Sequence, residues 1–402
     1  MEAYEQLVAE GYLASRPGGA TTVARASGIA HPHRTEVVEP AFAIDFRPGR
    51  PDLASFPRAA WMRSVRRALD EAPNDRLGYI DPRGVPEFRG ALAAYLDRVR
   101  GTDADPADVV VVTGFTQGLR LTAQVLADQG ARTIATEMPG QPEARDVVRA
   151  AGLRAVPILV DDAGLRVDHL ERSGADAVLV TPAHQYPMGA VLSAERRAAL
   201  IAWATRSGGL IIEDDYDAEF RYDREPIGAL QGLAPERVVY IGSASKTLAP
   251  GVRLGWLVAP TSWVERLATA KALSDQGSPT LDQLAFADFL SSGELDRHLR
   301  RTRPMYRGRR DTLLAALSRD LPDLRPVGAS AGLHILAWLP TGIDEDVLVR
   351  AATGAGIRLE GLRSKAADQG GGIIFGYGSA DEPAIERGVH QIGGLVDGLR
   401  GR

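Results

Sequence analysis

The chain has 402 residues, of which 45% are hydrophobic and 25% are charged, as in a globular protein of two or three domains. Its formal net charge of -5 excludes a strongly basic nucleic-acid footprint, and the absence of cysteine excludes disulfides, thiolate nucleophiles and cysteine-ligated metals. The histidines are scattered, no apolar run is long enough for a membrane span, and the N-terminus does not resemble a signal peptide. We therefore expect no metal site and a cytoplasmic location.

The first 42 residues differ in character from the rest of the chain. Residues 1–13 predict a short amphipathic helix, and residues 12–24, with Pro17-Gly18-Gly19 at the centre, predict a small hairpin. One helix and two strands are too little to fold alone, so we interpret residues 1–24 as the end of a larger domain. Residues 25–42 mix Pro, Gly, His and Arg without periodicity and predict a linker.

From residue 43 onward, short apolar runs alternate with helical patterns. Strands are expected at 109–113, 133–136, 155–159, 177–181, 210–213, 238–241 and 254–259, and helices at 117–128, 142–151 and 194–206. This alternation predicts an α/β domain over residues 43–289 with a mostly parallel sheet. Helical patterns at 281–290, 306–317 and 382–399 surround or follow strand-like runs at 334–338 and 373–377, and they predict a smaller α+β domain over residues 290–402.

The most informative segment is Ser243-Ala244-Ser245-Lys246-Thr247, which directly follows the apolar run 238–241. A lysine placed there can form a Schiff base with pyridoxal phosphate when burial and a nearby cation lower its pKa. Arg253 lies seven positions later, and its guanidinium could hold phosphate together with the Ser243 and Ser245 hydroxyls. The alternative is an ordinary surface lysine, which the preceding strand and the following Pro250-Gly251 disfavour.

A second candidate for phosphate binding is the turn Thr113-Gly114-Phe115-Thr116-Gln117 between a strand and a helix. Backbone N–H groups at a helix start favour an anion, and a glycine lets phosphate approach closely. The alternative is a routine strand–helix turn with a threonine cap. Because the turn occurs together with the lysine segment, we favour phosphate binding by Thr116 and Gln117.

An acidic run, from Glu213 through Asp214 and Asp215 to Asp217 and Glu219, follows the expected strand 210–213. Ligands bind outside the carboxyl ends of strands in open α/β sheets, and a buried carboxylate there could keep a pyridine nitrogen protonated. Tyr216 within this run could bond the phenolate oxygen of the ring. The alternatives are a divalent metal site, as in a metal-dependent hydrolase, and a solvated acidic loop.

Two stiff turns complete the set of candidates. Tyr186 lies in Thr181-Pro182-Ala183-His184-Gln185-Tyr186-Pro187-Met188-Gly189, which ends another expected strand, and Tyr79 lies in Gly78-Tyr79-Ile80-Asp81-Pro82. Prolines and glycines make such turns rigid, so both tyrosines could face the same pocket. A purely structural turn is the alternative in each case.

Taken together, these segments, with Arg47-Pro48-Gly49-Arg50-Pro51-Asp52 and Arg297-His298-Leu299-Arg300-Arg301, resemble the MocR subfamily of GntR-type transcriptional regulators. The resemblance implies a domain of fold type I aminotransferase architecture, in which a large domain with a mostly parallel seven-stranded sheet is followed by a smaller α+β domain. Residues 1–24 resemble the last helix and wing of the winged helix-turn-helix domain that precedes it in this family. We expect either a truncated reading of a longer regulator or a standalone enzyme.

The resemblance also implies residue roles. Lys246 would form the Schiff base with pyridoxal 5'-phosphate, Asp214 would pair with the pyridine nitrogen, and Tyr216 would bond the phenolate oxygen. The phosphate would be surrounded by Thr116, Gln117, Ser243, Ser245 and Arg253, with Tyr186 near the ring and Tyr79 reaching the phosphate of the other subunit in a homodimer.

Two positions depart from the family pattern. Gln141 stands where the family has a ring-stacking tyrosine, and the expected strand around 373–377 lacks the arginine that holds a substrate carboxylate in aminotransferases; Arg358 and Arg363 lie nearby. The first functional hypothesis is therefore the effector domain of a regulator that binds an amine or amino acid as an external aldimine. The alternative is a standalone aminotransferase, a transferase that turns over the same compounds. DNA is a partner only if the winged helix domain exists.

Overall fold

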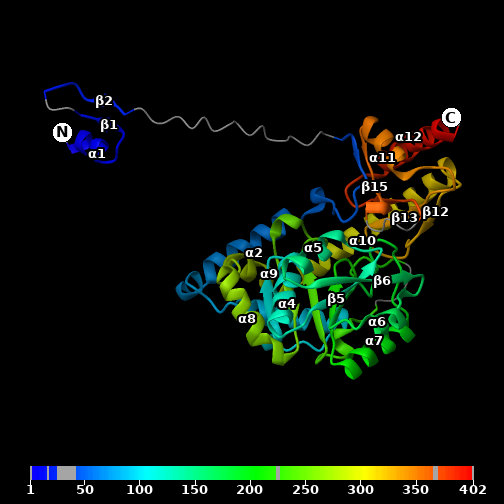
Figure 1. The fold of residues 1–402 in the computed structure, drawn as a ribbon, viewed down its shortest axis with the longest axis horizontal. Coiled ribbons are helices and arrows are strands. Elements are labelled where there is room, and N and C mark those ends of the chain that lie inside the picture. Colours follow the sequence, from blue (N-terminus) through cyan, green and yellow to red (C-terminus); the bar gives the residue numbers. More distant parts are fainter. Residues whose placement is uncertain (1, 16–17, 25–41, 223–226, 365–369, 401–402) are drawn as a thin grey trace. The chain divides into compact units, whose positions relative to one another are not determined.

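The computed structural model describes residues 2–15, 18–24, 42–222, 227–364 and 370–400, which form two units, Met1–Ala41 and Phe42–Arg402 (Figure 1). In the first unit, α1 (Glu2–Ala9) precedes a hairpin of β1 (Leu13–Ala14) and β2 (Thr22–Val23). The expected helix and hairpin are both present, although the helix ends four residues before Leu13. The predicted linker over residues 25–42 lies, except for Phe42, outside the described residues.

The second unit is built on an eight-stranded sheet. Its order is β4 (Val109–Val112), β11 (Gly255–Val258), β10 (Val238–Ser243), β9 (Leu210–Asp215), β8 (Ala177–Val180), β5 (Thr133–Met138), β6 (Arg154–Asp161) and β7 (Gly164–Leu165). All of these strands except β11 and β7 run in the same direction. The sheet is therefore mostly parallel, and the two-residue β7 adds one strand to the seven expected.

Helices cover both faces of this sheet. They are α2 (Arg58–Glu71), α3 (Pro86–Arg100), α4 (Phe115–Asp128), α5 (Pro142–Ala150), α6 (Val167–Ser173), α7 (Ala194–Ser207), α8 (Thr261–Asp275) and α9 (Thr280–Ser291) (Figure 1). Along β4, Val109 and Val111 join a core with α3 and α9, whereas Val110 and Val112 join a core with α4 and α8. Burial on both faces explains why the strands are continuous apolar runs rather than alternating ones.

The C-terminal part begins with the long α10 (Glu294–Asp320) and contains a four-stranded antiparallel sheet. The sheet order is β12 (Arg325–Val327), β13 (His334–Trp338), β16 (Gly372–Gly376) and β15 (Glu360–Gly361), with α11 (Glu345–Gly354) and α12 (Glu382–Arg400) as further helices. Ile335, Ile373 and Phe375 pack in the main core, while Leu336 and Ile374 form a separate apolar cluster on the other face. Because side chains alternate along a strand, His334 shares that second face with Leu336.

Short local signals set the ends of several helices. The Ser193 side chain accepts a hydrogen bond from the Arg196 N–H at the start of α7, and Gly208 ends the helix in the left-handed conformation at φ 72°. A parallel bridge between β3 (Ile44–Asp45) and β14 (Ile357–Arg358) joins the start of this unit to its C-terminal part. Among the described residues, no helix is both long enough and apolar enough to cross a bilayer.

Candidate functional site

The predicted functional segments meet at one edge of the large sheet. Thr113 follows β4, Asp214 lies next to the end of β9, and Ser243 ends β10. In the strand register, Ser243 pairs with Gly255, and Gly255 pairs with Val112 on its other side. The Lys246 loop and the start of α4 are therefore neighbours at the carboxyl ends of the strands, where open α/β sheets bind ligands.

Lys246 points its amine at the N-terminal arm of this unit. Its Nζ donates a hydrogen bond of 2.6 Å to the carbonyl oxygen of Gly49. Burial lowers the pKa of Lys246, and the positive charge of Arg50 adds to this effect, while the negative charges of Asp217 and Asp214 oppose it. The amine is thus half-buried and loses its proton more readily than a surface lysine, as a Schiff-base lysine requires.

The arm that covers Lys246 is held by close backbone packing. The Gly376 N–H donates to the carbonyl oxygen of Phe46 at 2.7 Å, and a Cβ atom on Gly376 would lie 2.1 Å from the carbonyl oxygen of Arg47. Asp52, farther along the arm, forms a 2.6 Å ion pair with Arg309 of α10. Glycine at position 376 therefore lets the arm run directly against β16, which fixes the Gly49 carbonyl over the lysine.

Asp214 is the buried carboxyl group of the site. Burial raises its pKa well above the usual range, the nearby charges of Asp215 and Asp217 add to this increase, and Lys246 opposes it. Asp214 also lines a small cavity together with Phe115, Gln141 and Tyr186. A buried carboxyl group in this position is stabilised by any cationic N–H group that enters the cavity.

Tyr186 lines this cavity, and Tyr216 contacts the Tyr186 ring from the loop after β9. The Tyr216 hydroxyl donates to the carbonyl oxygen of His184 at 3.0 Å and lies 3.1 Å from His184 Nδ1. The Tyr186 hydroxyl donates to Glu360 Oε1 at 3.4 Å, and the two tyrosine rings meet edge to face at 6.5 Å. Burial raises the pKa of both tyrosines, so both keep their hydroxyl protons at neutral pH.

Arg253 lies beside the start of α4. Arg253 has a left-handed backbone at φ 52°, and a Cβ atom on Gly114 would lie 3.6 Å from its Nη2 atom. Gly114 precedes α4, whose first N–H groups have no partners within the helix. Within the described part of the chain, no hydrogen bond or ion pair engages the Arg253 guanidinium.

The other predicted phosphate ligands are placed differently. Gln117 Oε1 accepts from the Thr113 N–H at 2.9 Å, and its Nε2 donates to Asp275 Oδ2 of α8 at 2.7 Å. Its side chain is therefore occupied, and its backbone N–H is the group left for an anion. Ser243 and Ser245 lie in the Lys246 loop, where the Ser245 N–H donates to Ser243 Oγ at 3.4 Å, and Thr116 is exposed on the first turn of α4.

The two arginines near the end of the chain have other contacts. Arg363 forms an ion pair with Asp344 at 3.2 Å, and the Arg358 guanidinium lies 5.1 Å from the centre of the Phe42 ring. On β16, Ile374 occupies the face that packs with Leu336 and Leu362. No arginine therefore stands on this strand to hold a carboxylate.

The site contains functional groups that the sequence patterns did not identify. His184 Nδ1 lies 2.9 Å from Asp217 Oδ2, and the His184 and His334 ring centres are 4.9 Å apart. Glu137, also buried, accepts a 2.5 Å hydrogen bond from the Thr181 hydroxyl, and burial raises its pKa to about 7. His334 follows His184 by 150 positions, so no local spacing could have paired them.

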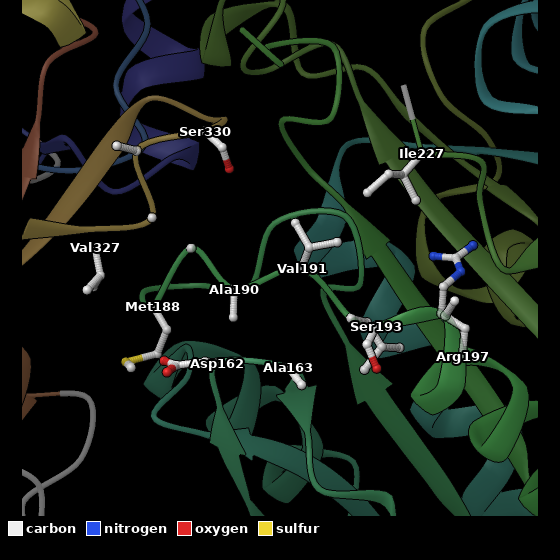
Figure 2. A pocket seen from close by; sticks show the side chains of 15 residues that line it. Asp162, Ala163, Met188, Ala190, Val191, Ser193, Arg197, Ile227, Val327 and Ser330 are labelled. Carbon is white, nitrogen blue, oxygen red and sulfur yellow. The ribbon is translucent and has the colours of Figure 1, made fainter. Parts of the chain in front are cut away.

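A larger groove of about 770 Å³ lies between the loop at 188–194 and the turn at 327–330 (Figure 2). Met188, Val191, Val327 and Ile227 give it a largely apolar lining, with Arg197 and Asp162 at its margin (Figure 2). It brings together no nucleophile, acid and base. We therefore assign the chemistry to the Lys246 edge rather than to this groove.

Comparison with known proteins agrees with this geometry. The family "Aminotransferase class I and II" matches residues 49–342. The pyridoxine biosynthesis transcriptional regulator PdxR of Corynebacterium glutamicum is 34% identical, covering 98% of this chain and 86% of PdxR. The probable rhizopine catabolism regulatory protein MocR of Rhizobium meliloti is 31% identical over 97% of this chain and 84% of MocR.

Among solved structures, the multiple substrate aminotransferase of Thermococcus profundus aligns with a TM-score of 0.83 at 26% identity, over 91% of this chain and 94% of that one. The fold is therefore that of the fold type I aminotransferases, as expected from the sequence. The chain belongs to the aminotransferase class I and II family, among the helix-turn-helix regulators of the MocR and PdxR type.

Proposed function

We propose that the protein is the effector-binding part of a transcriptional regulator, in which Lys246 carries pyridoxal phosphate and an amine or amino acid is the signal. The observation that carries this proposal is the half-buried Lys246 amine, placed between the buried Asp214 carboxyl group and the arm at Gly49. Pyridoxal phosphate is the cofactor of this aminotransferase fold. The described residues offer polar groups for its ring nitrogen, its phenolate oxygen and its phosphate.

The fit can be followed from one end of the cofactor to the other. Bound pyridoxal phosphate supplies an electron-withdrawing ring that acidifies the C–H bond of an attached amine. Asp214 would hold the proton at the ring nitrogen, because a buried carboxylate needs a cationic partner. Tyr216 would turn its hydroxyl from the His184 carbonyl toward the phenolate oxygen. The phosphate would lie against Arg253, Ser243, Ser245, Thr116 and the Gln117 N–H, with Tyr186 near the ring.

Replacing Arg253 with glutamine should weaken cofactor binding by about 10- to 100-fold, because a charge-assisted hydrogen bond contributes about 1.5–3 kcal/mol. Titration of the chain with pyridoxal phosphate, followed by absorption, measures this change. Arg266→Gln is the matched control, since Arg266 is exposed on α8 and its side chain donates to the Ser262 carbonyl oxygen. Equal affinities of the two variants would exclude Arg253 from the phosphate site.

We also propose a homodimer in which Tyr79 reaches the phosphate site of the other subunit. In the single chain Tyr79 is 93% exposed, and Leu77 beside it is 62% exposed. Large exposed apolar side chains next to each other are typical of an interaction surface. Tyr79→Phe should lower cofactor affinity about 3- to 30-fold while sedimentation still shows a dimer, because only one hydrogen bond is lost. A wild-type chain that sediments as a monomer at full cofactor occupancy would contradict this proposal.

A standalone aminotransferase is the second candidate function. It is favoured by the lowered pKa of Lys246, because a lysine that loses its proton can move protons on a bound substrate. It is disfavoured by Ile374, which stands on the strand where a carboxylate-binding arginine is expected. Incubation with an amino donor separates the two: a sensor shows a saturable spectral change without release of a keto product, whereas an enzyme releases it and turns over with a keto acid.

The regulator proposal includes the domain divisions. Residues 1–24 would be the last helix and wing of a winged helix domain, residues 25–42 a linker, residues 43–289 the large domain and residues 290–402 the small one. DNA would be the partner of a complete winged helix domain, and we propose a cytoplasmic location for such a regulator. Expression of a version extended by the upstream coding sequence, tested for sequence-specific DNA binding with and without cofactor, addresses this part.

A further inference from the structure

Three buried side chains from distant parts of the chain meet below the tyrosines of the site. They are His184 after β8, Asp217 after β9 and His334 at the start of β13, and their exposed fractions are 1%, 2% and 1%. One nitrogen of each ring and one oxygen of the carboxylate all lie within 4.8 Å of one another. The group therefore joins the edge of the large sheet to the first residue of β13 in the four-stranded sheet.

Both imidazoles of this group have an unpartnered nitrogen. Nε2 of His184 and Nε2 of His334 are buried and have no hydrogen-bond partner. The other nitrogen of His184, Nδ1, lies 2.9 Å from Asp217 Oδ2, and the His334 ring is hydrogen-bonded to the backbone of Pro187. Because the other nitrogen of His334 makes the contact with Pro187, its Nε2 carries a lone pair. An ion could take the place of the proton between His184 Nδ1 and Asp217 Oδ2.

Buried acceptors without a donor are costly, and each such group in a folded protein calls for an explanation. Here one nitrogen of each imidazole and a carboxylate oxygen are close together, and the Tyr216 hydroxyl beside them donates to the His184 carbonyl oxygen. A cation that accepts lone pairs would satisfy all three groups at once. The need for a cation follows from these three side chains and does not depend on the proposed cofactor.

We propose that His184, His334 and Asp217 form a binding site for a divalent transition metal ion of the Zn²⁺ type. Two neutral imidazoles and one carboxylate are the ligand set of many zinc sites, with a fourth position left open. A Zn–N distance of about 2.0–2.1 Å puts the ligand atoms of a tetrahedral site about 3.4 Å apart, so the three groups would need to approach by at most about 1.4 Å. The contact of the His334 ring with the backbone of Pro187 is typical of a metal-binding histidine, whose second nitrogen donates to an oxygen.

The ion would couple the two parts of the molecule. His334 belongs to the sheet of residues 325–376, whereas His184 and Asp217 belong to loops of the large sheet, so one ion would tie them together. His184 is also 3.1 Å from the Tyr216 hydroxyl, so metal binding would act on the residue proposed to contact the cofactor. The backbone around the site is already tight, because a Cβ atom on Gly332 would lie 2.1 Å from the His184 ring.

The experiment uses the full chain without a histidine tag, freed of bound metals by a chelator and of unbound cofactor by dialysis. Titration with Co²⁺ should give one bound ion per chain with the visible absorption of a tetrahedral site, and Zn²⁺ should displace it and raise the melting temperature. His334→Phe keeps an aromatic ring beside Tyr186, and Asp217→Asn keeps the side-chain volume. Each variant should bind Co²⁺ at least 10-fold more weakly.

His390→Phe is the matched control, because His390 is 79% exposed and stands 3.6 Å from Asp320, so it presents a histidine and a carboxylate at the surface. It should bind Co²⁺ like the wild-type chain. The proposal is overturned if the wild-type chain binds no stoichiometric ion, or if His334→Phe and Asp217→Asn bind as well as His390→Phe does. If His334→Phe does not fold, the number of Co²⁺ ions bound per wild-type chain and the Co²⁺ affinity of Asp217→Asn still test the proposal.

Discussion

Replacing Lys246 with alanine should abolish the visible absorption that the wild-type chain acquires on addition of pyridoxal phosphate. The physical reason is that only an amine held at the cofactor aldehyde can form the covalent bond that produces this absorption. Lys246 meets the requirement, since its Nζ is half-buried and its pKa is lowered by burial. We expect complete loss of the band, measured by absorption spectroscopy, and loss of the label at Lys246 after borohydride reduction and mass spectrometry of the peptides.

The control for this experiment is Lys271→Met. Lys271 is also buried, but its Nζ donates to Asp275 at 2.6 and 2.7 Å on α8, and that ion pair leaves it no role at the cofactor. The Lys271→Met chain should keep the absorption band. After removal of unbound cofactor, a wild-type chain without an aldimine band, or a Lys246→Ala chain that keeps this band, would refute the assignment.

The parts of the site that could be predicted are those encoded locally. Lys246 and Arg253 lie within ten residues after a strand, Asp214 is the next-to-last residue of one, and short apolar runs identify strands buried on both faces. Parallel strands bring their carboxyl ends to one edge, so local patterns were enough to place these residues together. The predicted Asp214 and Lys246 pair is close enough in the structure that each charge affects the other's pKa.

The parts that could not be predicted depend on contacts between distant segments. The Gly49 carbonyl oxygen meets Lys246 across 197 positions of sequence, and His334 meets His184 across 150. The direction of the Gln117 side chain depends on Asp275 of α8, which no pattern in the α4 turn reveals. Such contacts are set by tertiary packing, and a single sequence carries no record of them.

The sequence patterns also failed to predict some helices in whole or in part. Of the 14 residues of α2, Ser64 and Ala68 alone are buried, so its apolar stripe is too weak to stand out. The helix α3 has six buried residues, but its last one is Arg100, a charged residue that a hydropathy pattern assigns to the surface. The pattern at 306–317 predicted only the second half of the long α10, because Pro304 argues in sequence for a break rather than for one continuous helix.

Arg100 lies in a buried network directly behind the site. Its Nε donates to Asp215 Oδ2 at 2.7 Å, its Nη1 donates to the Ile227 carbonyl oxygen at 2.8 Å, and the Tyr240 hydroxyl donates to the same carboxylate at 2.6 Å. The exposed fractions of Arg100 and Asp215 are 2% and 7%. Asp215 is the neighbour of Asp214 on β9, so this network supports the strand end that carries Asp214.

Replacing Arg100 with methionine should lower the free energy of unfolding by about 3–5 kcal/mol, because the change leaves the Asp215 carboxylate buried without its cationic partner. Denaturant unfolding measures the loss. The double variant Arg100→Met with Asp215→Asn should lose less, since removing both charges also removes the unpaired one, and Tyr240 can still donate to an asparagine oxygen.

The control variant for the same helix is Arg98→Met. The Arg98 side chain is 57% exposed and pairs with Asp296 at 2.9 Å, and exposed pairs of this kind contribute about 0–1 kcal/mol. If Arg100→Met costs no more than Arg98→Met, the buried network does not stabilise the fold as argued. If it costs several kcal/mol and also weakens cofactor binding, the network acts on Asp214 through the shared strand, because Arg100 itself contacts Asp215 and not the cavity.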